Sequence, residues 1–226
     1  NLPLTYGLGE QTDASFPEMV AHAKSILSVS VAEGFGLGFL EPWTFGKGLG
    51  GRNLPDITSD FSELGVSLAN LYDWLPVPLD CISSVIQLKK TLQSALEEFY
   101  LSYQQDLPQD GTETAFQSIV ANDSIDFGRL DEPTQQEIIR AVAQSPELQQ
   151  GIQKHAGLEV LAEDIIDRNR EAVAEQFSLT SYAERTRKIY QELLATEDNI
   201  SCQFANGQLL LDQYLSPARL NLLRTS

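Results

Sequence analysis

Residues 25–58 constrain the fold more than any other part of this chain of 226 residues. They begin with a short apolar, β-branched run at 26–31, which predicts a strand, and a turn rich in glycine follows at 33–36. A second apolar run at 37–45 ends at a glycine, which predicts a helix. The glycine-rich residues 47–53 then predict a second strand or a loop. This order of elements indicates one unit of an α/β fold.

The turn at 33–36 and the start of the helix after it predict a ligand site. A helix N-terminus carries unpaired N–H groups and the positive end of the helix dipole, and Gly34 and Gly36 let a ligand approach the backbone closely. We therefore expect an anion there, most naturally a phosphate. Glu33 and Glu41 flank this site, and Glu41 is expected about 8–9 Å along the axis of a helix that starts near Phe35. A carboxylate can accept two hydrogen bonds from a vicinal diol. A nucleoside diphosphate sugar has this layout, with a hexose at one end and a ribose further along.

Both glutamates stand in the string Ser-x-x-Glu-Gly-Phe-Gly-Leu-x-Phe-Leu-Glu, which begins at Ser30. This string resembles the nucleotide-sugar motif of retaining glycosyltransferases of the GT-B fold. The resemblance covers about residues 1–60 and 165–194. It implies a helix-rich α/β fold, in which the chain is part of a Rossmann-like GT-B C-terminal domain with a large helical insertion and C-terminal helices.

The resemblance also implies roles for individual residues. Glu33 is the expected catalytic residue, which holds hydroxyls of the donor sugar, and Glu41 holds those of the ribose. The other expected donor-binding residues are Gly34, Phe35, Gly36 and Leu37. Lys47 and Arg52 are candidate phosphate-binding residues. No metal and no cofactor are expected, because fixed dipoles and basic side chains stabilise the leaving diphosphate.

Composition narrows the class of partner. The net charge of −17 disfavours non-specific binding to nucleic acid and to anionic membranes. No apolar run reaches the roughly 18 residues that a membrane span needs, and no signal peptide is evident, so a cytoplasmic protein is expected. Cys81 and Cys202 lack the spacing of metal ligands, and we interpret both as free thiols, with Cys81 buried.

Three regions are expected along the chain. Residues 1–64 form the Rossmann-like donor-binding half-domain, residues 65–160 the helical insertion, and residues 161–226 the C-terminal helices with a tail. The apolar tail is expected to pack back on the helical region or on a missing partner domain. Local patterns predict a strand at 4–8, helices at 16–24 and 55–64, and four helices between residues 82 and 154. Capping boxes at Ser15 and Ser181 predict two helix starts.

The motif and the rest of the chain support different functions. In the first function, which the motif supports, the chain is the donor-binding domain of a glycosyltransferase. This enzyme moves a hexose to an unidentified acceptor hydroxyl with retention of the anomeric configuration. The acceptor domain and the diphosphate clamp would then lie upstream of Asn1, and the chain alone is expected to be inactive. In the second, it is a non-catalytic helical interaction or scaffold domain derived from such an enzyme, as the glycines at 48–51 and the unmatched residues 80–160 favour. A sugar phosphorylase on the same fold is a weaker alternative.

Overall fold

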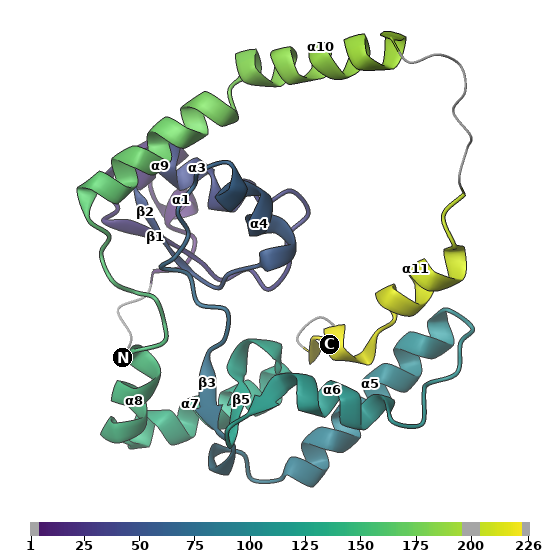
Figure 1. The fold of residues 1–226 in the computed structure, drawn as a ribbon. Coiled ribbons are helices and arrows are strands. Elements are labelled where there is room, and N and C mark those ends of the chain that lie inside the picture. Colours follow the sequence, from purple (N-terminus) through teal and green to yellow (C-terminus); the bar gives the residue numbers. More distant parts are fainter. Residues whose placement is uncertain (1–4, 196–203, 223–226) are drawn as a thin grey trace. The chain divides into compact units, whose positions relative to one another are not determined.

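The computed structural model describes residues 5–195 and 204–222 (Figure 1). Helices account for 59% of the structure and strands for 9%, so the chain is helix-rich as expected, and its sheets are small. The chain divides into two compact units. Unit 1 comprises residues 1–73 and 157–199, and unit 2 comprises residues 74–156 and 200–226. These limits differ from the expected divisions after residues 64 and 160, and the described part of the tail belongs to unit 2.

Unit 1 contains a parallel pair of strands, β1 (Ser25–Ser28) and β2 (Gly48–Gly51). Ser25 lies opposite Gly48, and Ser28 lies opposite Gly51. The 3-10 helix η1 (Leu37–Phe39) and the helix α3 (Glu41–Thr44) lie between the strands in the chain. The predicted order of strand, helical segment and strand is present, and η1 and α3 form part of the crossover connection that parallel strands require.

The core of unit 1 lies around Trp43, which is completely buried on α3 and whose indole N–H donates to the carbonyl of Phe39 at 2.7 Å. Helices α4 (Pro55–Glu63) and α9 (Glu163–Gln176) add side chains to this core. Its buried members are Phe39, Leu40, Trp43, Leu49, Phe61, Val66, Leu68, Leu71 and Val173. The buried amide of Asn169 on α9 pairs with both backbone groups of Ser67 at 2.8 Å, which fixes α9 on the core.

The glycines of β2 are explained by residues 157–161, which lie against this strand. A Cβ at Gly50 would be only 2.8 Å from the carbonyl oxygen of Gly157, and one at Gly48 would be 3.5 Å from Leu161. Gly157 in turn lies against Asn70, because its own Cβ would be 2.5 Å from that residue's carbonyl oxygen. The sequence left open whether the glycines mean a close approach or a flexible loop, and the structure has the close approach.

Two further helices precede β1. Helix α2 (Phe16–His22) confirms the first capping box, since the backbone N–H of Ser15 donates to Glu18 Oε2 at 2.8 Å. The strand predicted at 4–8 is wrong for the described residues 5–8, because Leu8 instead begins the short helix α1 (Leu8–Gln11). Gly7 adopts a left-handed conformation, with φ of +62°, which ends the extended backbone directly before this helix.

The second predicted capping box is also wrong. Helix α10 (Leu179–Ala195) begins before Ser181, whose backbone N–H donates to Ser178 Oγ at 3.2 Å. Ser178 offers the same hydroxyl cap three residues earlier, so the helix gains almost a turn at its start. None of the residues of α10 is buried.

Unit 2 begins with the strand β3 (Pro76–Pro78), which pairs antiparallel with β5 (Ser124–Asp126), and β5 also pairs with β4 (Val120–Ala121). We expected an irregular stretch through Trp74, Pro76 and Pro78, since proline lacks the N–H that a central strand donates. The sheet order β3-β5-β4 puts β3 at an edge, where proline is tolerated. The 3-10 helix η2 (Leu79–Cys81) follows, and Cys81 is buried as expected. Cys202 lies outside the described residues.

The four helices predicted between residues 82 and 154 are confirmed as α5 (Val85–Ser102), α6 (Gly111–Ile119), α7 (Glu132–Gln144) and α8 (Pro146–Gln153). The 3-10 helix η3 (Phe127–Arg129) precedes α7. The described tail forms α11 (Gly207–Tyr214) and the 3-10 helix η4 (Pro217–Arg219). Leu215 and Leu222 of the tail are buried in the core of unit 2, to which Leu92 of α5 also belongs. The tail therefore packs on the helical region.

Candidate functional site

The carboxyl ends of β1 and β2 lie at the same edge of their sheet, because the strands are parallel. Residues 29–36 follow β1 at this edge, and residues 52–54 follow β2. In open parallel sheets, ligands bind outside the carboxyl ends of the strands. This edge is therefore the candidate site of unit 1.

Glu33 lies in the loop that follows β1, where it is half-buried. The hydroxyl of Ser30 donates to Glu33 Oε1 at 2.6 Å, within the same loop. The carboxylate also lies beside η1, since a Cβ at Gly38 would be 3.7 Å from Glu33 Oε1. The hydrogen bond fixes the carboxylate and uses one of its two oxygens.

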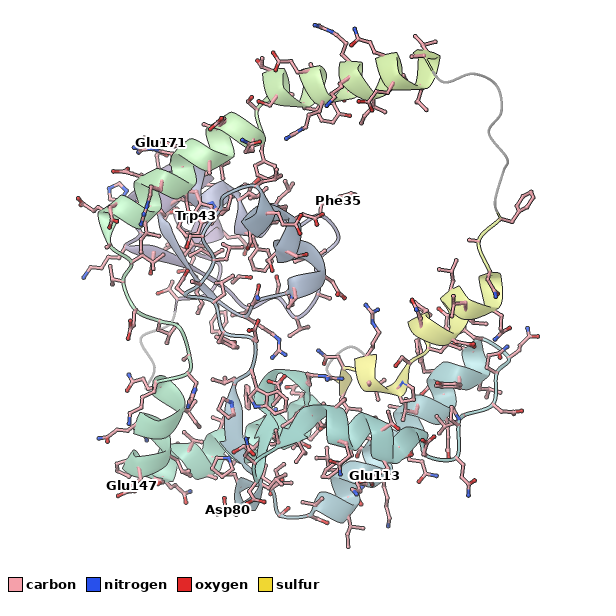
Figure 2. The ribbon with its side chains drawn as sticks, viewed as in Figure 1. Phe35, Trp43, Asp80, Glu113, Glu147 and Glu171 are labelled. Carbon is pink, nitrogen blue, oxygen red and sulfur yellow. The ribbon has the colours of Figure 1, made fainter. Side chains whose placement is uncertain are left out.

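Gly34 and Phe35 lie on the open side of this loop. A Cβ added at Gly34 would meet no atom within 4 Å, so packing within the fold does not require glycine there. Phe35 is 88% exposed, and its side chain points away from the ribbon of unit 1 in Figure 2. Leu37 is also exposed, at 58%. The loop thus presents backbone and apolar side chains to solvent beside Glu33.

Gly36 differs from Gly34, because the fold itself requires it. Its φ is +70°, a conformation that side chains disfavour. An added Cβ would lie 2.3 Å from Ile57 Cγ2 and 3.0 Å from Phe61, both on α4. The missing side chain of Gly36 therefore makes room for α4, and its face toward Ile57 is closed to a ligand.

The continuous helix predicted at 37–45 is wrong. The structure has η1 and then α3, with a break at Leu40. Pro42 explains the break, because a helix through this position would lack the hydrogen bond to the carbonyl of Gly38 and would clash with it. Among the described residues, this edge of the sheet therefore lacks the N-terminus of a long helix, which we expected to bind an anion. Glu41 is exposed at the start of α3, and its expected position along a helix that starts near Phe35 does not apply.

The two candidate phosphate ligands lie at opposite ends of β2. Lys47 precedes the strand, and its ammonium donates to the carbonyl of Ala21 at 2.8 Å, near the C-terminus of α2. A cation is favourable there, because that end of a helix is negative. Arg52 follows the strand at the carboxyl end and is half-buried, with its backbone bridged to Tyr72. Arg52 thus shares the edge with the Glu33 loop, and Lys47 does not.

Sequence reasoning missed a polar group at the same edge. The side-chain amide of Asn53 donates to Asp73 Oδ1 at 2.7 Å, and the hydroxyl of Thr58 donates to Asn53 Oδ1 at 2.5 Å. Asn53 also borders an open hollow of about 510 Å³ that continues along residues 65–69. A polar residue directly after a predicted second strand was the signal that would have found it.

No known protein family, curated protein or solved structure matches this chain. Among the described residues, no group of three or more histidine, cysteine or acidic side chains could hold a metal ion. The helices of the described part are all too short or too polar to cross a membrane.

Proposed function

We propose that unit 1 is the donor-binding part of a retaining glycosyltransferase with a Rossmann-like, GT-B type domain. It would bind a nucleoside diphosphate sugar, whose hexose is transferred to an acceptor hydroxyl. The observation that carries this proposal is that Glu33, within the motif string, follows the carboxyl end of β1 in a parallel strand pair and is already oriented by Ser30. Gly34 adds support, since nothing in the fold accounts for its missing side chain.

In this function Glu33 accepts hydrogen bonds from hydroxyls of the donor sugar. Ser30 holds Oε1, which leaves Oε2 to accept from the ligand. As the anomeric carbon becomes cationic in the transition state, the fixed carboxylate stabilises it more than it stabilises the ground state. Arg52, at the same edge, contributes positive charge toward the diphosphate. Glu41 accepts hydrogen bonds from the ribose.

A second function has its own support. The helix break at Leu40 weakens a phosphate site, because no long helix N-terminus is left to bind the anion. The site is also weakened because the ammonium of Lys47 already donates to the carbonyl of Ala21 on α2. These observations favour a non-catalytic interaction domain derived from a glycosyltransferase, in which the motif survives as part of the scaffold.

Saturation-transfer difference NMR and calorimetry on the 226-residue chain distinguish the two. We expect a sugar nucleotide from a panel of UDP-glucose, UDP-N-acetylglucosamine, GDP-mannose and ADP-glucose to bind. Loss of a charged hydrogen bond in Glu33→Gln or Glu41→Gln should weaken that binding about 10- to 150-fold. The matched control is Glu63→Gln, an exposed glutamate on α4, which should leave the affinity unchanged. If neither motif variant differs from wild type, or if no sugar nucleotide binds, the interaction domain is the better assignment.

A further inference from the structure

A groove in unit 2 lies outside the site proposed above. Its volume is about 430 Å³, within the range of roughly 300–1,000 Å³ typical of small-molecule sites. It lies between the C-terminal half of α5, α11 and the segment that contains η4. Its lining residues are Phe99, Leu210, Gln213, Tyr214, Ser216, Arg219, Leu220 and Asn221.

Tyr214 provides an aromatic face in this groove. Its ring centroid lies 5.7 Å from that of Phe99 and 5.4 Å from that of Tyr103, and the two tyrosine hydroxyls are 3.1 Å apart. These contacts fix the ring, yet Tyr214 remains 56% exposed. The exposed face of the Tyr214 ring suits a ligand that stacks on it.

The wall opposite α11 is held in place by Arg129. Its guanidinium donates to the carbonyl oxygens of Ser118 at 3.1 Å, Ala218 at 2.7 Å and Leu220 at 3.2 Å. These bonds connect α6 and η3 to the backbone that lines the groove. The site is therefore preorganised, and little ordering entropy is lost when a ligand binds.

The polar part of the lining suits hydroxyl groups. Gln213 and Ser216 each carry both donors and acceptors, as a hydroxyl group does. None of the described residues that line the groove is acidic, so a cationic ligand is disfavoured. Arg219 is the one cation in that lining, whereas phosphate sites usually combine several donors of this kind. A neutral or weakly acidic ligand with many hydroxyls fits best.

We propose that this groove binds a glycan, with one sugar ring stacked on Tyr214. The face of a sugar ring carries C–H groups and is apolar, whereas its hydroxyls project from the edge toward Gln213 and Ser216. This inference does not rest on the proposed function of unit 1. Binding in the groove itself requires no sugar nucleotide.

An NMR titration of the isotope-labelled 226-residue chain tests this inference. The probes are maltohexaose, cellohexaose, chitohexaose and mannohexaose, each without sugar nucleotide. We expect at least one of them to shift the resonances of Phe99, Tyr214 and their neighbours in the groove. Tyr214→Ala should weaken binding at least about 10-fold, and Tyr214→Phe, which keeps the ring, should stay within about 3-fold. Gln213→Ala should weaken it about 2- to 12-fold.

The matched control is Gln208→Ala, which lies on α11 outside the groove and should not change the affinity. If Tyr214→Ala fails to fold, Gln213→Ala decides, because Gln213 is exposed. The inference is overturned if no probe shifts the groove resonances, or if the variants that fold bind as wild type. Glycan binding without sugar-nucleotide binding would contradict only the proposed function of unit 1. Sugar-nucleotide binding without glycan binding would contradict only the glycan site in the groove.

Discussion

Gly34 and Gly36 are separated by one residue, yet they have different physical causes. Gly36 has a positive φ and faces α4 at a distance that admits no side chain. Gly34 has open space where its Cβ would be. The first glycine therefore serves folding, and the second is available to serve a ligand.

Alanine substitutions separate these two causes. Gly36→Ala should lower the free energy of unfolding by at least about 2 kcal/mol, because the left-handed backbone costs about 1 kcal/mol and the overlap with Ile57 adds to it. Gly34→Ala should change it by less than about 0.5 kcal/mol. Denaturant unfolding followed by circular dichroism measures both. Equal values for the two variants would show that α4 does not pack against Gly36.

The candidate site was predictable from the sequence only in part at this scale. Glu33 and its loop were located by composition and glycine placement, which are local signals. The partner of Glu33 was not predicted, although Ser30 is only three residues away, because the direction of a side chain in a loop depends on the backbone there. Lys47 and Arg52 were equivalent candidates in the sequence. Their surroundings differ because β2 lies between them and places them at its opposite ends.

Among the elements, the periodic ones were predictable and the short ones were not. The apolar stripe of α5 and the Ser-Pro start of α8 are local signals that tertiary packing did not override. Pro42 was the sequence signal for the break at Leu40, because its missing N–H outweighs the helix that an apolar run predicts. Strand β3 was not visible, since it forms by pairing with β5, which lies far along the chain.

The capping box of α2 has a pH dependence that tests it. The hydroxyl of Ser15 and then its backbone N–H donate to Glu18, and both bonds lower the pKa of this carboxyl. A lowered pKa in the folded state means that the carboxylate adds stability above the pKa of an unfolded glutamate, about 4.3. That contribution is lost as the pH falls through the folded value.

Thermal unfolding of wild type and Glu18→Gln measures this effect. We expect wild type to have the higher Tm at pH 7, and the difference should close in acid, since the glutamine keeps the shape without the charge. Ser15→Ala should remove most of the pH dependence of this difference. A gap that stays constant down to pH 3 would show that the charge of Glu18 is not what the cap uses.

At the scale of the whole molecule, unit 1 is built from two stretches of chain that are separated by residues 74–156. The chain leaves unit 1 after Asp73 and returns at Gly157. These points are close, because a Cβ on Gly157 would be 3.7 Å from the ring of Tyr72 and 2.5 Å from the carbonyl oxygen of Asn70. The intervening residues therefore begin and end at nearly one position of unit 1.

This arrangement predicts that unit 1 folds without unit 2. A variant with residues 1–73 joined to residues 157–199 by a Gly/Ser linker of about four residues should keep a cooperative unfolding transition, because such a linker spans the short gap. The control joins residue 73 to residue 162 and so lacks the segment that covers Gly48 and Gly50. It should unfold at lower denaturant concentration or not fold. Loss of cooperativity in both variants would show that unit 1 depends on unit 2.

The contact between Gly50 and Gly157 also sets an order of events during synthesis. Roughly 80 residues separate the start of unit 2 from Gly157, and at about 5–20 residues per second the ribosome takes about 4–16 s to make them. During that interval β2 has already been synthesised, whereas the segment that covers its glycines has not. The core of unit 2 likewise contains Leu215 and Leu222, which are translated only after unit 1 is complete. Each unit is therefore incomplete on the nascent chain while residues of the other unit are being synthesised.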